Sequence, residues 1–249
     1  MKKIMTIAGI VLGGMSIAAP VRSMLGARHI ALQDGSEENL YPIPDNAVKI
    51  EYIETQGRRS NSNYGQHINL PLIGGRPYII EIDIELLYLN VAKTADICSI
   101  ASSSQGANRA IYLRMDITNS RYCIASSKNI RYVNTSDVYG RHKFRTEANI
   151  SKSEMNLYCD NELLLTCPGL PASNMNLYLF ACNTGSGNYT TGGARCKCYG
   201  MKVWDSSTNK LVMDLIPIRI GTIGYMFDYC SGEVFGNSGT ESFLLGPDI

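Results

Sequence analysis

Three carboxylates stand at every second position in the segment "YIIEIDIELLYL": Glu81, Asp83 and Glu85, with isoleucines between them. On a β-strand, alternate side chains point to one face, so the three acids would project together. Retaining glycosidases use two carboxylates about 5–5.5 Å apart. Residues four apart on a strand are roughly 13 Å apart at the backbone, a gap that two long Glu side chains can close. The spacing is therefore compatible with sugar hydrolysis.

The same acidic pattern has two other interpretations. Acids that alternate with isoleucine are typical of any strand with one face in solvent, and such a face could also contact a ligand. Two observations weigh against catalysis: the segment comes early in the chain, and the single tryptophan, Trp204, lies far from it in sequence. We therefore expect Glu81, Asp83 and Glu85 to form a solvated strand face, and assign no catalytic residue.

The rest of the chain predicts the elements that would position such a face. Short segments of alternating polarity, separated by turns rich in Gly, Asn and Asp, run from Val48 to the C-terminus. Asp160-Asn161 predicts a hairpin turn, and Gly200 predicts a β-bulge. No long stretch has apolar residues at helical spacing. The pattern predicts an all-β fold, a two-sheet antiparallel β-sandwich of the jelly-roll type.

The N-terminal residues differ from the rest. A basic start is followed by an apolar run of 16 residues, Ile4 to Ala19, and by small residues suited to processing. This pattern predicts a signal peptide or apolar leader over residues 1–28, and export of the protein. Pro, Asp and Gly mark residues 29–47 as a linker. Residues 48–249 then form the β-sandwich domain.

Composition limits the partners. The 249 residues carry a net charge of +1, and 45% of them are hydrophobic, which indicates a globular protein without an electrostatic affinity for nucleic acid. A membrane contact would come only through an uncleaved leader. The eight cysteines contain no C-x-x-C pair, which argues against a zinc ribbon. We expect most of them to be small buried residues, with room for one or two cross-strand disulfides.

No cofactor or metal site is predicted. The chain has no G-x-S-x-G, phosphate-binding or dinucleotide motif. Asp228, Asn237 and Asp248 could offer oxygens to Ca²⁺, but their spacing matches no calcium loop. The three histidines are expected to be surface or turn residues; they are His29, His67 and His142.

A sugar site on a β-sandwich would need aromatic faces and planar polar side chains on loops. Two loops offer such residues, although ordinary turn chemistry explains them as well. The candidate ligand-binding residues are Asn61, Asn63, Tyr64, Asn183, Asn188 and Tyr189.

Several blocks of sequence resemble the concanavalin A-like lectin/glucanase superfamily, in its laminin-G-like form common in exported proteins of gut bacteria and their phages. The opening "IEYIETQGRRSNSNYGQHINL" is similar to that group's "YIESTGTQYIDTGI", and "MNLYCDNELLLT" to its "LYVDG" hairpin. The closing "MKVWDSSTNKLVMDLIPIR" and "GYMFDYCSGEVFGNSGT" match it most closely. The chain departs from the group at Gln66-His67-Ile68, where the group has Asp-Thr-Gly. The resemblance covers about 200 residues.

The resemblance implies a two-sheet jelly roll with a concave face, which more often binds glycans than cleaves them. Laminarinases and lichenases of this superfamily carry an E-x-D-x-E strand, but in the middle of the domain and among aromatic platforms. We therefore expect an exported, non-catalytic module that binds a glycan or another cell-surface ligand. Two alternatives stay open: a glycoside hydrolase that uses Glu81, Asp83 and Glu85, and a structural or adhesion module of a cell surface or phage particle.

Overall fold

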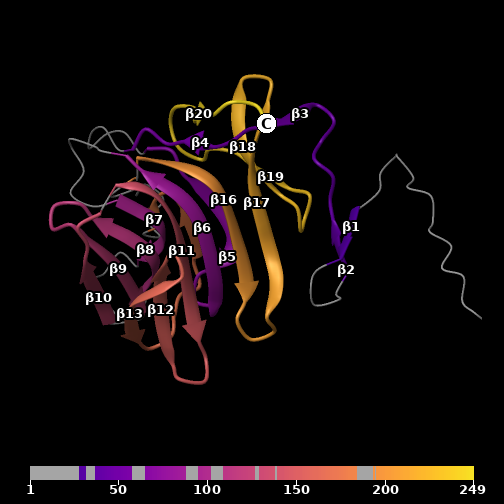
Figure 1. The fold of residues 1–249 in the computed structure, drawn as a ribbon. Helices are drawn as coiled ribbons and strands as arrows, with labels where there is room; N and C mark the ends of the chain where they lie inside the picture. The colour runs from indigo at the N-terminus through magenta and orange to yellow at the C-terminus, as the bar shows by residue number, and fades with distance from the viewer. Residues whose placement is uncertain are drawn as a thin grey trace, which may run out of the picture.

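The protein is described from a computed structural model, shown in Figure 1. The structure describes residues 28–31, 37–57, 65–87, 95–101, 109–126, 129–137, 139–183, 193 and 195–249. These residues form strands and connections, without a helix. The described part of the chain accordingly offers no helical segment of the length and apolarity that a membrane crossing requires. The first two strands, β1 (Arg28–Ala31) and β2 (Glu37–Leu40), pair with each other as a separate two-stranded sheet.

The larger sheet of the sandwich has eleven strands. Its main path runs through β13 (Glu162–Pro168), β12 (Glu154–Cys159), β11 (Gly140–Asn149), β6 (Tyr78–Leu86), β16 (Cys196–Asp205), β17 (Lys210–Ile220), β18 (Ile223–Asp228) and β19 (Val234–Phe235). Beside this path, β3 (Ala47–Lys49) pairs with β17, and β4 (Ile53–Glu54) pairs with β16 and β20 (Leu244–Leu245). The acidic segment of the sequence is thus a central strand of this sheet, β6.

The smaller sheet has seven strands. Its path runs through β10 (Asn129–Asn134), β9 (Arg121–Ser126), β8 (Arg109–Asp116), β7 (Ala95–Ala101), β14 (Asn176–Leu179) and β5 (Ile68–Ile73), with β15 (Cys182–Asn183) parallel to β7. Figure 1 shows this sheet behind β11 and β6 of the larger sheet, so the molecule has two layers. The prediction of an all-β, two-sheet antiparallel sandwich is confirmed.

The core lies between the two sheets. Strand β6 contributes Ile80, Ile82 and Ile84, which are at most 3% exposed. The smaller sheet contributes large side chains to the same core, among them Leu70 and Tyr112, which are fully buried. Burying a side chain of this size stabilises the fold by about 1.5–3 kcal/mol. The isoleucines of β6 therefore face inward, and the acids between them must face outward.

Two local predictions are confirmed. Asp160 and Asn161 both have positive φ, 50° and 72°, as a two-residue hairpin turn of type I′ requires. The turn brings Cys159 opposite Glu162 on β13. In β16, the pairing with β6 shifts register between Cys198 and Gly200, which is the predicted bulge.

The cysteines in this sheet are free thiols. Cys167, Cys196 and Cys198 are fully buried and carry no disulfide, as the interpretation of small buried residues expects. Cys159 is also free, because the hairpin register places it several residues from Cys167. Core packing rather than cross-linking therefore holds this part of the sheet.

The two ends of the domain meet in the larger sheet. Strand β3 pairs with β17, and Ile50 forms a bridge with Asp248 near the C-terminus. Before β3, the backbone N–H of Tyr41 donates to the carbonyl oxygen of Tyr229 at 2.9 Å. The division into a leader of residues 1–28, a linker of 29–47 and a domain of 48–249 stays a prediction.

Candidate functional site

The acidic side chains of β6 lie on the outer face of the larger sheet, away from the core. Glu81, Asp83 and Glu85 are partly exposed, while the residues between them are buried. The sheet pairs β6 with β11 on one side and with β16 on the other, antiparallel to both. The three acids therefore occupy the middle of a broad surface built by three strands.

Both neighbouring strands place basic residues beside these acids. Strand β11 sets Arg141 opposite Glu85 and Arg145 opposite Glu81. Strand β16 sets lysines opposite the same two acids, from its own side. We call this group the charge ladder; its members are Glu81, Asp83, Glu85, Arg141, Lys143, Arg145, Lys197 and Lys202. Opposite charges on adjacent strands stabilise a sheet by a few tenths of a kcal/mol to about 1 kcal/mol per pair.

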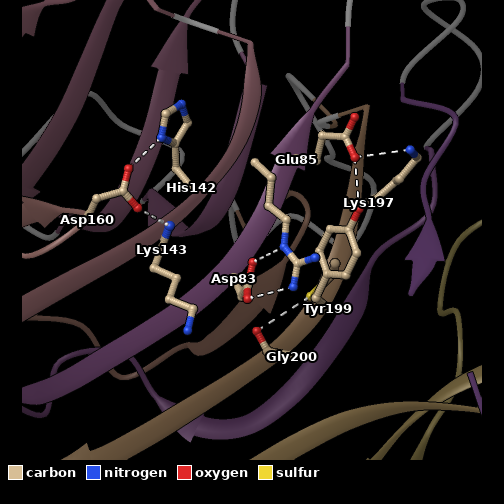
Figure 2. Close-up of polar contacts among 10 residues, drawn as sticks. Asp83, Glu85, His142, Lys143, Asp160, Lys197, Tyr199 and Gly200 are labelled. Atoms are coloured by element: carbon tan, nitrogen blue, oxygen red, sulfur yellow. Dashed lines mark hydrogen bonds and ion pairs between the residues drawn. The ribbon is translucent and has the colours of Figure 1, made fainter. Parts of the chain in front are cut away.

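Each acid of the ladder has a cation of its own. Asp83 binds Arg141 in a two-pronged contact, with Oδ1 2.9 Å from Nε and Oδ2 3.1 Å from the terminal nitrogen. Glu85 Oε2 accepts hydrogen bonds from Lys197 Nζ at 3.0 Å and Tyr199 Oη at 2.8 Å, as Figure 2 shows. Glu81 is 3.6 Å from the guanidinium of Arg145. The carboxylates are thus drawn to separate partners rather than toward one another.

The partners of Glu85 decide its protonation state. Burial raises the pKa of this carboxyl, but the hydrogen bonds from Lys197 and Tyr199 and the charge of Lys197 outweigh that effect, and the pKa is lowered below its usual value. A general acid in sugar hydrolysis needs the opposite, a pKa raised so that it holds a proton near neutral pH. Glu85 is therefore held as a carboxylate, suited to accept hydrogen bonds.

Two tyrosines join the ladder at the Glu85 end. The guanidinium of Arg141 lies over the ring of Tyr199, 3.5 Å from its centroid. Tyr52 meets Tyr199 edge to face, with ring centroids 5.5 Å apart, and Lys197 Nζ lies 4.9 Å from the centroid of Tyr52. We call these five residues, Tyr52, Glu85, Arg141, Lys197 and Tyr199, the aromatic corner. The charge pattern of β16 and the alternation around Tyr52 could have located both tyrosines, but neither was among the sequence candidates.

The residues proposed from the loops fare differently. Asn183 is half-buried in β15, and its side-chain Nδ2 donates to the carbonyl oxygen of Asn176 at 2.8 Å, which ties β15 to β14. This side chain therefore satisfies a backbone carbonyl group between the two strands. The other loop candidates, Asn61, Asn63, Tyr64, Asn188 and Tyr189, lie outside the described residues.

The possible calcium ligands are used in different local contacts. Asp228 is buried, and its Oδ1 accepts the backbone N–H of Asp214 at 2.7 Å. Asn237 accepts the N–H of Gly239, and Asp248 pairs with Arg219 at 2.7 Å. None of these contacts joins the three residues in one site.

The histidines are more enclosed than expected. His67 lies in the loop before β5, but it is only 8% exposed and stacks on Tyr178 with ring centroids 4.8 Å apart. Burial lowers its pKa. His142 is in β11, and its side chain is only 15% exposed. For His29 the structure describes the backbone of β1 alone.

His142 belongs to a second group of ionisable residues, at the turn between β12 and β13. Its Nδ1 is 2.8 Å from Oδ2 of Asp160, as Figure 2 shows, and its Nε2 is 3.5 Å from Oδ2 of Asp137. The Sγ of Cys159 is 3.7 Å from the same Asp160 oxygen. Burial, followed by the charge of Asp160, raises the pKa of the Cys159 thiol to about 12. We call Asp137, His142, Cys159 and Asp160 the rim cluster.

An open depression of about 550 Å³ lies beside the other end of β6. Its floor includes the hydroxyl of Ser206, which is buried without a hydrogen-bond partner among the described residues. The lining residues are Ile79, Glu147, Ala148, Asn149, Ile150, Ser151, Ser206 and Ser207. It carries no aromatic ring, so it offers less to a sugar than the aromatic corner.

Comparison with known proteins supports the fold. No protein-family model matches the chain, and no curated protein matches it by sequence. A solved SAP-like pentraxin from Limulus polyphemus superposes with a TM-score of 0.53 at 10% identity, over 80% of this chain and 97% of that one. A Bacteroides ovatus protein to which carbohydrate binding has been ascribed also gives 0.53, at 9% identity, over 80% of this chain and 60% of that one.

At such low identity these likenesses show the fold alone. The chain has the fold of a jelly-roll β-sandwich, as the resemblance in sequence implies. Membership in the concanavalin A-like superfamily stays a prediction from the sequence blocks quoted above.

Proposed function

We propose that this chain is a non-catalytic binding module that takes a glycan at the aromatic corner. The observation that carries the proposal is the combination of aromatic rings, a guanidinium and a carboxylate on rigid neighbouring strands. Sugar sites use aromatic faces for the apolar side of the ring and planar polar groups for its hydroxyls. Tyr52 and Tyr199 supply rings, and Arg141 and Glu85 supply the planar groups.

The corner keeps hydrogen-bonding capacity for a ligand. A guanidinium has five N–H donors, and Arg141 directs Nε and one terminal nitrogen to Asp83. Glu85 uses Oε2 for both Lys197 and Tyr199, so Oε1 can accept a hydrogen bond from a hydroxyl group of the ligand. The Arg141 side chain is 49% exposed, and that of Glu85 is 27% exposed. Adjacent donors and an acceptor suit the neighbouring hydroxyls of a sugar.

Chain connections favour this end of the sheet. The backbone N–H of Thr55 donates to the carbonyl oxygen of Cys196 at 2.9 Å, and that of Leu87 donates to Arg195 at 2.9 Å. The segments 58–64 and 184–192, which hold the loop candidates, therefore connect to described residues beside the start of β16. Asn61, Asn63, Tyr64, Asn188 and Tyr189 are included in the proposed site from the expectation of the sequence alone.

The absence of catalysis is part of the proposal. It is supported by the lowered pKa of Glu85 and by the separate cation that each acid of β6 holds. Export is also part of it, and is supported by the basic start and apolar run within residues 1–28. With a net charge of +1, a glycan or cell-surface ligand suits the chain better than nucleic acid.

Binding to a glycan array, followed by titration of the best ligand, tests the site. We expect Tyr52→Ala and Arg141→Gln each to weaken binding by about tenfold or more, since a lost hydrogen bond or ring contact costs about 1–3 kcal/mol. The matched control is Lys202→Gln, a cation of the same outer face but away from the corner, which should bind as the unchanged protein does. An array without binding above background, or equal losses in control and corner variants, would refute the proposal.

The alternatives give distinct results. Turnover of laminarin or lichenan that is lost in Glu81→Gln would show a hydrolase instead. Capture of a surface protein that no sugar competes for would show an adhesion module.

A further inference from the structure

The rim cluster places one imidazole between two carboxylates. Asp160 Oδ2 faces Nδ1 of His142 at 2.8 Å, and Asp137 Oδ2 faces Nε2 at 3.5 Å. Two acids thus stand beside one ring, and Nε2 is buried without a hydrogen-bond partner among the described residues.

The thiol of Cys159 distinguishes the two sides of the ring. Its Sγ is 3.7 Å from the Asp160 oxygen that faces Nδ1. One nitrogen, one sulfur and one carboxylate oxygen from His142, Cys159 and Asp160 lie within 4.8 Å of one another. Imidazole nitrogen, thiolate sulfur and carboxylate oxygen are the donors that Zn²⁺ takes in proteins, at about 2.0–2.3 Å each. Donors around one tetrahedral ion are roughly 3.3–3.7 Å apart, so a pair that is up to 4.8 Å apart here would have to close by about 1 Å.

We propose that His142, Cys159 and Asp160 bind one zinc ion, and that Asp137 orients the imidazole from its other nitrogen. Metal-binding histidines commonly donate their second N–H to a carboxylate, which fixes the ring and strengthens the ligand. Asp137 stands near that position, with Oδ2 3.5 Å from Nε2, and it would have to turn toward the ring to accept that N–H, because Nε2 makes no hydrogen bond to the described residues. The remaining coordination position is open to water, because the side chains of Asp137 and Asp160 are 68% and 56% exposed.

The surrounding structure already holds these groups in place. Oδ1 of Asp160 accepts the backbone N–H of Lys143 at 2.9 Å, which leaves Oδ2 turned to the ring, as Figure 2 shows. The ring of His142 packs against Phe144, with centroids 5.9 Å apart. The carbonyl oxygen of Asp137 accepts the hydroxyl of Tyr122 at 2.8 Å. These contacts fix the backbone and the ring around the site, and the ion would have to bring the ligand atoms closer together.

The site does not depend on the proposed glycan function. It uses none of the five residues of the aromatic corner, and zinc binding would stand if no sugar were bound. Strand pairing creates it: Phe144 pairs with Cys159 across β11 and β12, which carries the turn at Asp160 back to His142. Residues 18 positions apart thereby meet.

Zinc and cobalt titrations of the reduced full-length chain test the proposal. We expect one high-affinity Zn²⁺ per chain, a rise in melting temperature with zinc, and a thiolate-to-cobalt charge-transfer band when Co²⁺ replaces it. Cys159→Ser should abolish that band and weaken zinc binding by at least tenfold. Asp137→Asn should keep the band and weaken binding by about 10- to 100-fold, the usual effect of removing a metal ligand's carboxylate partner.

The matched control is Cys230→Ser, which alters another half-buried cysteine away from the cluster and should leave zinc affinity and the cobalt band unchanged. Circular dichroism checks that each variant keeps its β-sheet spectrum, and Asp137→Asn carries the test if Cys159→Ser does not fold. Three results would overturn the proposal: no zinc bound at micromolar concentration, a cobalt spectrum without the thiolate band, or equal affinity in Cys159→Ser. Nitrogen NMR that finds both ring nitrogens of His142 protonated in the presence of zinc would also overturn it.

Discussion

The charge ladder is built around acids of β6, and the rim cluster around acids in the connections before β11 and after β12; the two sets of acids are balanced in different ways. In the ladder, each carboxylate has Lys or Arg beside it on a neighbouring strand, as Asp83 has Arg141. In the rim cluster, Asp137 and Asp160 share the imidazole of His142, and a thiol lies next to them. A saturated set of ion pairs favours structure or binding over proton transfer. Carboxylates that lie beside an imidazole and a thiol provide ligands suited to a metal cation.

The largest effect we expect separates the two faces of β6. Ile84→Ala should destabilise the protein by about 2–5 kcal/mol, because the side chain is fully buried and leaves a cavity. Glu81→Ala, on the outer face of the same strand, should change stability by less than about 0.5 kcal/mol. Urea denaturation measures both. Similar losses of stability in the two variants would mean that the charge ladder contributes more to the free energy of unfolding than its solvent exposure suggests.

The next effect concerns the rim. Asp160→Ala should cost about 1–3 kcal/mol in unfolding free energy, since it removes the acceptor for the N–H of Lys143 and puts alanine at a φ of 50°. Asp160→Asn keeps an acceptor and tolerates this backbone conformation, so it should cost less than half as much. Thermal unfolding without metal compares them. An equal loss of unfolding free energy in the two variants would mean that Asp160 stabilises the protein through its charge rather than through the turn conformation.

A smaller effect is expected within the ladder. The double-mutant cycle of Asp83→Asn and Arg141→Gln should give a coupling of about 0.2–1 kcal/mol, as for exposed ion pairs, because the Arg141 side chain is 49% exposed. The coupling should fall as salt rises. A coupling above about 2 kcal/mol, insensitive to salt, would contradict the description of the ladder as a solvated face.

The smallest effect is the pH dependence from Glu85. Its pKa is lower in the folded protein than the usual 4.5, so its stabilising contribution is complete above about pH 4.5 and is lost as the pH falls through the folded value. The difference in melting temperature between the unchanged protein and Glu85→Gln should therefore shrink as the pH falls below about 4.5. A difference that grows as the pH falls would mean that Lys197 and Tyr199 do not favour the carboxylate.

Much of the fold follows from local pattern. Alternation of Ile with Glu and Asp in β6 determines which residues are buried, since a strand has a period of two. The turn at Asp160-Asn161 and the bulge at Gly200 follow from residues that tolerate those backbone conformations. The sequence pattern predicts the candidate site less well, because the aromatic corner depends on which strands become neighbours. Tyr52 and Tyr199 are distant in sequence and meet only when β4, which follows Tyr52, pairs with β16.

The sequence by itself determined that Glu81, Asp83 and Glu85 share one face, because their spacing leaves no other arrangement on a strand. It also placed Arg141, Lys143 and Arg145 at alternate positions, whereas Lys197 and Lys202 are five positions apart and share a face only through the bulge before Gly200. Only the tertiary structure decided that those cations lie beside these acids, because strand order and register depend on the packing of the whole core. The rim cluster was decided in the same way, since the pairing of β11 with β12 carries Cys159 and Asp160 to His142.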